Sequence, residues 1–275
     1  MLRLPQAWRA ALRARAEQPP AGPRVPLALV PEGESTPVQV GSVAPALIEA
    51  LAGDLRRDGC LRPWRADATD AAGGWLIEGA PDAGLQWLAH ALRARGLCGP
   101  WRDELLAVHD AQGQRVAVVE RGAVRPLGIT TQAVHLVGRS PDGRHWVQQR
   151  ARNKANDPGK LDTLMGGMVS AADTVKQALA RETQEEAGLA LSSLAALRHG
   201  GRITIQRPSS AAEGLGWMHE HIDWFECEVP DGVQPCNQDG EVEAFHLLDL
   251  PGLQAHLLDD AFTLEAALVI SAAQP

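Results

Sequence analysis

Apolar and polar residues alternate in several short stretches of the chain, and this pattern predicts β-strands. The clearest is Thr130–Gly138 (T-T-Q-A-V-H-L-V-G), where every second side chain would face the interior of a half-buried strand. The turn residues Pro141-Asp142-Gly143 then lead into another strand. By the same reasoning we expect strands at residues 73–77, 115–120, 145–150, 201–206, 219–229 and 243–248.

Apolar residues spaced by three or four positions predict helices elsewhere. We expect them at residues 4–12, 43–57, 82–95 and 253–273, the first as a short docking helix. Residues 18–37 contain six prolines, which exclude a helix and predict an extended segment laid along the surface. The chain is therefore expected to be α+β. We divide it into an accessory domain of residues 1–124 and a larger domain of residues 125–275 built around a mixed sheet.

Composition excludes several classes of protein. Of the 275 residues, 45% are hydrophobic and 22% charged, which is typical of a soluble globular protein. The net charge of -8 argues against a nucleic-acid partner, and no apolar run approaches the roughly 20 residues of a membrane span. None of the four cysteines forms a C-x-x-C pair, so we expect a reduced, cytoplasmic protein without a zinc site.

The segment that carries chemistry is Gly166–Leu189. Ser170 is the expected N-cap of a helix there, with Asp173 as its capping partner. An apolar stripe of Val175, Ala178 and Leu179 follows. Continued at helical spacing, this stripe leads onto carboxylates, namely Glu182 and Glu186, with Glu185 beside them.

Clustered carboxylates repel one another, at about 0.2–0.5 kcal/mol per like-charge pair on a helix surface. Divalent cations relieve that repulsion, because hard metal ions bind carboxylate oxygens. Arg181 stands four residues before Glu185 and can orient that carboxylate, and Gly188 is placed to end the helix in a left-handed conformation. A solvated, charge-rich surface helix would explain residues 181–186, but not the flanking Gly167 and Gly188.

The segment resembles the Nudix motif, G-x5-E-x7-R-E-U-x-E-E-x-G-U, in which U is a bulky aliphatic residue. Seven of the nine fixed positions match: Gly167, Arg181, Glu182, Glu185, Glu186, Gly188 and Leu189. Asp173 stands where the family has Glu, and Thr183 where it has an aliphatic residue. Asp173 keeps the charge but has a shorter reach, and Thr183 weakens packing only.

This resemblance implies a Nudix α/β/α sandwich and a Mg²⁺- or Mn²⁺-dependent pyrophosphohydrolase. Arg181 and the three glutamates of the motif would be catalytic. The glutamates would also bind the metal, together with the carbonyl of Gly166. The implied reaction converts X-P-P to X-P and phosphate, or to X-P and Y-P when both ends are substituted. Which carboxylate is the general base is left open, and a homodimer is implied by the family alone.

Shorter matches resemble one Nudix subfamily, which is associated with thiamine pyrophosphokinases and carries a similar preceding domain. They are W-R-D-E-L at 101–105, V-V-E-R at 118–121, V-H-L-V-G at 134–138, K-A-N-D-P-G-K-L-D at 154–162 and N-Q-D-G-E-V-E-A-F at 237–245. The resemblance covers roughly residues 97–248. It implies hydrolysis of oxidised thiamine diphosphate to the monophosphate.

Residues outside the motif supply further candidates. Arg152, Lys154 and Lys160 precede it and form either a phosphate grip or a solvated basic loop. Glu220 is a candidate metal carboxylate, in competition with Glu241 and Glu243. The indoles of Trp217 and Trp224 are candidates to stack on a cationic heterocycle, and core packing is the alternative, favoured for Trp224.

Two rival functions remain at this stage. One is hydrolysis of ADP-ribose, dinucleotides or oxidised nucleoside triphosphates. The other is a Nudix-fold regulator that binds a phosphorylated ligand without cleaving it. The complete carboxylate set with Arg181 favours hydrolysis of a small-molecule diphosphate, since a binding protein does not need it.

Overall fold

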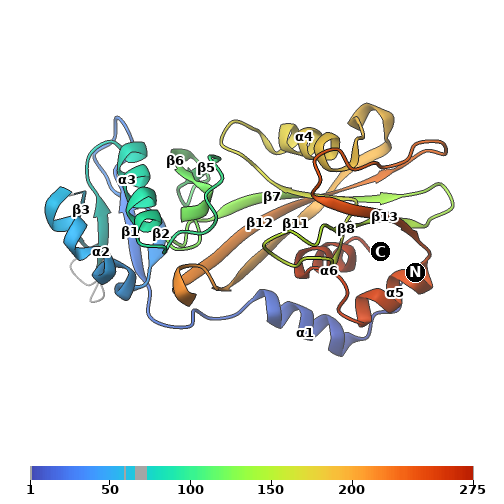
Figure 1. Ribbon diagram of the computed structural model, residues 1–275, viewed down its shortest axis with the longest axis horizontal. Helices are drawn as coiled ribbons and strands as arrows, with labels where there is room; N and C mark the ends of the chain where they lie inside the picture. Colours follow the sequence, from blue (N-terminus) through green and yellow to red (C-terminus); the bar gives the residue numbers. More distant parts are fainter. Residues whose placement is uncertain (1, 59, 66–72, 275) are drawn as a thin grey trace.

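The computed structural model describes residues 2–58, 60–65 and 73–274. The chain forms two lobes that lie side by side along the long axis of the molecule, and a small hairpin stands between them (Figure 1). Within the described ranges, no helix is long and apolar enough to cross a membrane.

The smaller lobe contains a four-stranded sheet in the order β2-β1-β4-β3. Strands β1 and β4 run parallel and the other pairs antiparallel. The strands are β1 (Val25–Leu29), β2 (Val38–Val43), β3 (Leu61–Trp64) and β4 (Gly74–Ile77). Two helices, α2 (Pro45–Asp58) and α3 (Pro81–Ala94), pack on the sheet through fully buried leucines such as Leu47 and Leu85. The expected helices at 43–57 and 82–95 are thus confirmed to within a few residues.

The proline-rich segment does not lie on the surface, so that prediction was wrong for its middle part. Residues 25–29 form β1, which is an inner strand between β2 and β4, and Leu27 and Leu29 are fully buried. Pro26 stands near the start of this strand, where a missing N–H donor costs little pairing. The apolar run V-P-L-A-L therefore outweighs the prolines that flank it.

The larger lobe is built on a seven-stranded mixed sheet with the main order β11-β12-β7-β8-β13. Only the β12–β7 pair is parallel, and β10 and β9 add to β7 and β8 respectively. The strands are β7 (Thr131–Arg139), β8 (His145–Arg150), β9 (Leu161–Asp162), β10 (Met165–Met168), β11 (Ala195–Ser209), β12 (Gly216–Glu228) and β13 (Val242–Leu248).

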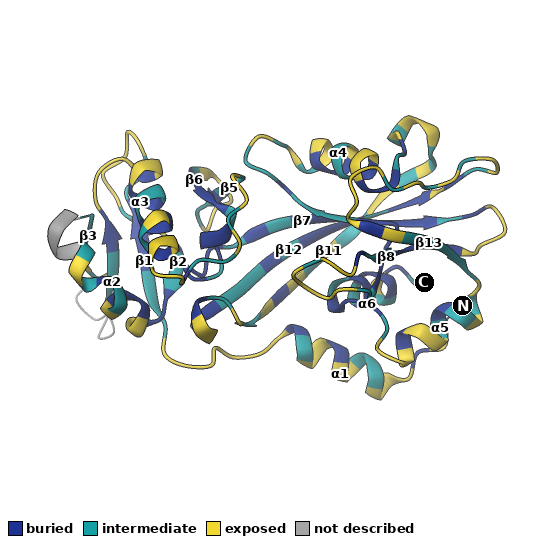
Figure 2. Ribbon diagram, viewed as in Figure 1, coloured by how far each residue is buried: buried dark blue, intermediate teal, exposed yellow. Residues whose placement is uncertain are grey.

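Helices cover both faces of this sheet, which confirms the α/β/α sandwich. Helix α4 (Val175–Ala187) lies on one face over a core that includes Val134 and Leu136. The opposite face carries α1 (Gln6–Ala16), α5 (Leu250–Leu258) and α6 (Leu264–Ala272). The central strands β7 and β12 are largely buried while the outer sides of the helices are exposed (Figure 2).

The two ends of the chain meet on the larger lobe (Figure 1). Leu4 and Leu12 of the N-terminal segment share a buried core with Ile270 of α6, so α1 is a docking helix for the larger lobe. The expected C-terminal helix is two helices, because the chain turns at Asp260, which has a left-handed φ of 54°.

A two-stranded hairpin joins the lobes. It consists of β5 (Leu105–His109) and β6 (Arg115–Glu120), followed by a short 3₁₀ turn at Arg121–Ala123. Its apolar side chains pack in the core of the smaller lobe. The hairpin also reaches the loop before α4, because Ala171 N donates to Leu105 O at 2.7 Å.

Candidate active site

Helix α4 begins one turn later than the sequence suggested. The N-cap is Thr174, whose hydroxyl accepts from Gln177 N at 3.3 Å while the Gln177 side chain accepts from Thr174 N at 2.9 Å. This reciprocal pair is a capping box. The prediction of Ser170 as N-cap was wrong, because Ser170 and Asp173 form a local turn ahead of the helix. Gly188 ends the helix with a φ of 65°, as predicted.

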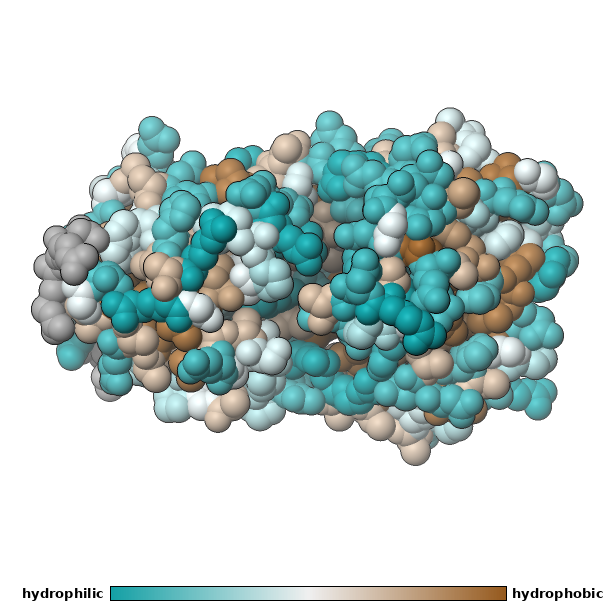
Figure 3. All heavy atoms as spheres, viewed as in Figure 1, coloured by the Kyte–Doolittle hydropathy of each residue, from teal (hydrophilic) through white to brown (hydrophobic). Residues whose placement is uncertain are grey.

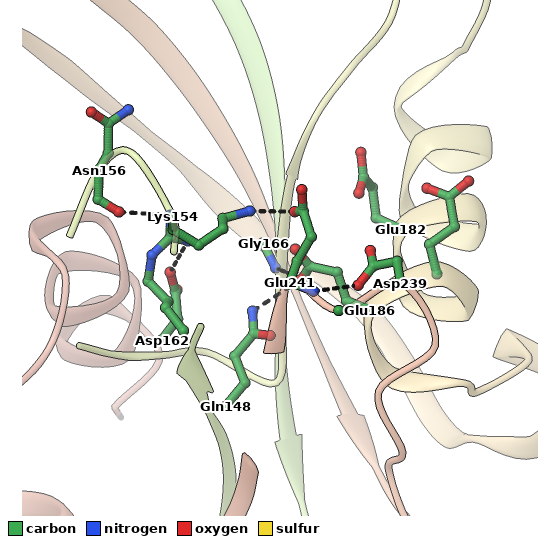
Figure 4. A network of polar contacts seen from close by, with 12 residues as sticks. Gln148, Lys154, Asn156, Asp162, Gly166, Glu182, Glu186, Asp239 and Glu241 are labelled. Carbon is green, nitrogen blue, oxygen red and sulfur yellow. Dashed lines mark hydrogen bonds and ion pairs between the residues drawn. The ribbon is translucent and has the colours of Figure 1, made fainter. Parts of the chain in front are cut away.

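Glu186 is the most deeply buried acid of the helix, with 3% of its surface exposed. Its Oε2 accepts from the backbone N–H of Gly166 at 3.1 Å and from Nε2 of Gln148 at 3.0 Å (Figure 4). Burial raises the pKa of this carboxyl to about 8 in spite of both hydrogen bonds. A carboxyl that is desolvated to this degree is costly to ionise unless a cation approaches it.

Glu182 lies one turn earlier on the same side of α4 and faces β10. A Cβ on Gly167 would stand 2.2 Å from the Glu182 carboxyl carbon, so a larger residue there would displace this carboxylate from its position. Burial raises the pKa of Glu182 to about 7, although Arg181 opposes the shift. Gly167 of the motif thus contributes to the site by leaving space for the Glu182 side chain.

Arg181 holds three carboxylates together. Its guanidinium donates to Asp173, Glu182 and Glu185, each at 2.9 Å. The shorter Asp173 therefore still reaches Arg181. Glu185 is the outermost acid, with a side chain that is 48% exposed.

The oxygen atoms of this site are of the chemical type that binds divalent cations. Glu186 is buried, Glu182 is half-buried, and their charges repel each other. Carboxylate with backbone carbonyl oxygen is the donor set of Mg²⁺ and Mn²⁺. Within the described residues, however, no three His, Cys, Asp or Glu side chains stand close enough together to hold an ion as placed. Glu185 is bound to Arg181, so its participation requires rotation of its side chain.

Glu220 is not brought to this group. It lies on β12 among residues that face α6, and Arg125 pairs with it at 2.7 Å. Burial alone would raise its pKa, but Arg125 and a hydrogen bond from Thr131 hold the pKa below its usual value. Glu220 is therefore a buried partner of Arg125 on the opposite side of the sheet from α4.

The basic candidates separate from one another. Lys154 forms an ion pair with Glu241, drawn with the Glu186 network in Figure 4. Arg152 is 77% exposed and lies 3.5 Å from Glu243. Lys160 donates to the Phe262 carbonyl at 3.4 Å. Of the three, Lys154 is the one that joins the polar network around the helix.

The tryptophans also differ. Trp224 is 6% exposed in the core beneath α6, and its ring fills the space where a Cβ on Gly200 would stand. This placement is that of a packing residue. Trp217 is half-buried at the start of β12, where its backbone N–H donates to Arg125 O at 2.9 Å.

Gln148 belongs to the site and was missed from the sequence. It is buried on β8, on the same side as Trp146, and its amide holds Glu186. The sequence feature that could have indicated it is a polar residue at an inward-facing position of a strand with alternating apolar residues. Its Oε1 is a buried atom without a hydrogen-bond partner, beside the acid that it binds.

Comparison with known families places this helix in a recognised domain. Residues 130–266 match the family model of the NUDIX domain, and this range contains α4, β10 and Gln148. Residues 130–266 form a NUDIX domain. The smaller lobe and the hairpin precede it as an additional region.

Two curated relatives extend beyond the NUDIX domain. Nudix hydrolase 24, a chloroplastic protein of Arabidopsis thaliana, is 28% identical over 176 residues, which are 61% of this chain and 47% of that protein. An uncharacterized protein of Saccharomyces cerevisiae is 25% identical over 62% of this chain and 53% of its own length. The chain thus spans about half the length of the curated relatives it matches. A crystal structure from Deinococcus radiodurans is 20% identical, covers 62% of this chain and all of its own, and has a TM-score of 0.49.

Proposed function

We propose that the protein is a divalent-metal-dependent pyrophosphohydrolase that cleaves a diphosphate linked to an organic group. The observation that carries the proposal is a pair of acids on one side of α4, of which Glu186 is buried and Glu182 lies against Gly167 of β10 with 14% of its side chain exposed. Two adjacent carboxyls with raised pKa values are a poor structural choice for a core-facing helix. They become useful when a cation and a phosphate are present.

Each residue of the site has a separate role in this proposal. Glu182, Glu185 and Glu186, with the Gly166 carbonyl, would hold Mg²⁺ or Mn²⁺, which supplies Lewis-acid stabilisation of the charge that builds up on phosphate oxygens. Gln148 and Gly166 N keep the Glu186 carboxylate in one orientation. Arg181 positions Glu182 and Glu185. One of these carboxylates would accept the proton of the attacking water.

For the substrate we propose oxidised thiamine diphosphate, cleaved to the monophosphate. The support is the resemblance of five short segments outside the motif to the subfamily associated with thiamine pyrophosphokinases. Two of these segments, residues 154–162 and 237–245, include Lys154 and Glu241, which form an ion pair beside the Glu186 network.

The test is a substrate panel with purified protein and Mg²⁺. Thiamine diphosphate, its oxidised forms, ADP-ribose, dinucleotides and oxidised nucleoside triphosphates are each incubated, and phosphate and monophosphate release is measured. Glu186→Gln is the inactive variant, and Glu228→Gln, an exposed acid at the end of β12, is the matched control.

The outcomes separate the levels of the proposal. Release from the oxidised thiamine compound that Glu186→Gln abolishes, and Glu228→Gln leaves intact, supports both the reaction and the substrate. Turnover of ADP-ribose or nucleotides alone retains the reaction and rejects the thiamine substrate. Metal binding without turnover of any compound rejects hydrolysis and favours a ligand-binding regulator.

A further inference from the structure

Two sequence segments outside the NUDIX domain, W-R-D-E-L at 101–105 and V-V-E-R at 118–121, form one structure. Glu120 is buried, and its Oε1 accepts from Arg102 N at 2.9 Å and from Gly122 N at 3.3 Å. Arg121 N donates to Glu104 O at 2.9 Å, and the two side chains pair at 2.7 Å. We call this unit the arginine corner; it comprises residues 101–105 and 118–122.

The arginine corner is braced from the smaller lobe. The guanidinium of Arg93 on α3 lies 4.3 Å from the centre of the Trp101 ring, and Trp101 Nε1 donates to Asp103 at 2.7 Å. Asp103 itself adopts a left-handed φ of 55°, which is unfavourable for a residue other than glycine. Support of this kind fixes the backbone from which the neighbouring Arg102 and Arg121 side chains project.

The arginine corner is also attached to the loop that begins the catalytic helix. Leu105 O accepts from Ala171 N and the Arg115 guanidinium donates to Ala171 O, both at 2.7 Å. Ala171 lies three residues before the N-cap of α4. The hairpin that carries the arginine corner is therefore tied by two hydrogen bonds to the loop that leads into the helix of Glu182 and Glu186.

The charges of the arginine corner act on both sides of the site. Glu104 is close enough to Glu182 to contribute to its raised pKa. On the other side, burial alone would raise the pKa of Glu241, but Lys154, Arg121 and Arg102 together hold it below its usual value. Arg102 and Arg121 thus stand within electrostatic reach of the Lys154–Glu241 pair, and the surface is hollowed between the two lobes (Figure 3).

We propose that Arg102 and Arg121, supplied by the region before the NUDIX domain, bind the diphosphate of the substrate together with Lys154. This inference rests on the proposed function. Lys154 is paired with Glu241 and Arg121 with Glu104, and Arg102 is exposed on the same arginine corner. An arriving diphosphate would compete with the two acids for their cations. The preceding region is then a part of the substrate site and not only an appended domain.

Binding is tested separately from turnover with methylenediphosphonate, a diphosphate that is not hydrolysed, in the presence of Mg²⁺. Calorimetry on the full chain compares Arg102→Gln and Arg121→Gln with Arg62→Gln. Arg62 is the matched control, because it is an exposed arginine on β3 of the smaller lobe, in a 2.8 Å ion pair with Glu78. We expect about tenfold weaker binding for Arg102→Gln and for Arg121→Gln, because each loses one charge-assisted contact. Binding by Arg62→Gln should not change.

Kinetics supply the second readout. With the substrate found in the panel, KM should rise about tenfold for Arg102→Gln and Arg121→Gln while kcat stays within about twofold, because these residues bind ground state and transition state alike. Arg121→Lys should recover part of the affinity by restoring the charge.

The results distinguish this inference from the proposed function. Wild-type affinity in both glutamine variants, or no binding of the diphosphonate by the wild type, would overturn the inference. Turnover that depends on Glu186 but not on either arginine would retain the function and reject the arginine corner. Diphosphonate binding that needs both arginines, in a protein that hydrolyses nothing in the panel, would support the inference and reject hydrolysis.

Discussion

At the scale of single residues, the site depends on carboxyl groups placed where an apolar side chain would be expected. Glu186 is the clearest, because its pKa of about 8 lies far above the usual value near 4.5. The folded protein therefore binds this proton more tightly than the unfolded chain does. That contribution to stability is fully present below about pH 4.5 and is lost as the pH rises through about 8.

The direction of this pH dependence of stability gives a prediction for the metal-free protein. In EDTA, the melting temperature of the wild type should fall relative to that of Glu186→Gln between pH 5 and pH 8.5, because the amide stays neutral throughout. Scanning calorimetry across this range measures the difference, and Mg²⁺ should restore the wild type most strongly at the alkaline end. A difference that is independent of pH would show that Glu186 is ionised throughout this range.

Gly167 provides a second prediction at this scale. In Gly167→Ala the new methyl group must displace the Glu182 carboxyl, which lies 2.2 Å from its position. A shift of about 1 Å at a catalytic group costs on the order of 100-fold in rate, so kcat should fall by about that factor. Gly22→Ala is the control, because nothing lies within 4 Å of the added carbon there. Near-normal kcat in Gly167→Ala would mean that Glu182 can act from another position.

At the scale of elements, the capping box of α4 decides where the catalytic helix begins. Thr174→Ala removes the hydroxyl that caps Gln177 N and should lower the free energy of unfolding by about 1 kcal/mol. Ser192→Ala, at an exposed position in a short 3₁₀ turn, should change it by no more than about 0.5 kcal/mol. Urea titration of both variants measures the difference, and equal effects would contradict the assigned cap.

Regular periodicity made much of this architecture predictable. The alternation in residues 130–138 and the apolar stripe of α4 led to the correct elements, because each has one buried face. Strand β10 was not expected, since M-G-G-M lacks alternation and its pairing with β7 is set by the fold. The N-cap was misplaced because Ser170 and Thr174 are both capping residues, and only the backbone path selects between them.

The same limit applies to the site. The positions on α4 follow from spacing within one helix, which sequence specifies. Gln148 and the arginine corner approach from distant segments, and their places depend on sheet pairing and on how the lobes meet. Glu220 was wrongly grouped with the site for the same reason. Its neighbours in sequence did not show that its side chain lies on the face of the sheet opposite α4, where it pairs with Arg125.

At the scale of the whole molecule, function under these proposals depends on how the two lobes are held together. Arg24 forms one of the polar connections between them. Its guanidinium donates to the Leu215 carbonyl of the larger lobe at 2.6 Å, to the Ser42 carbonyl and to Pro126 O at 3.3 Å. Burial lowers the pKa of Arg24 to about 10, which still leaves it charged at neutral pH.

Replacing Arg24 with methionine keeps much of its volume but leaves these carbonyls without their donor. We expect a loss of about 2 kcal/mol, because hydrogen bonds to a charged group contribute about 1.5–3 kcal/mol and Arg24 is half-buried. Because the loss falls at the junction, the smaller lobe should separate from the NUDIX domain before either unfolds. Calorimetry should then show two transitions where the wild type shows one, and Arg62→Met should retain the single transition. If the arginine corner binds substrate, KM of Arg24→Met should rise even at temperatures where both lobes are folded. A single transition with an unchanged KM would show that the β5–β6 hairpin alone holds the lobes in place.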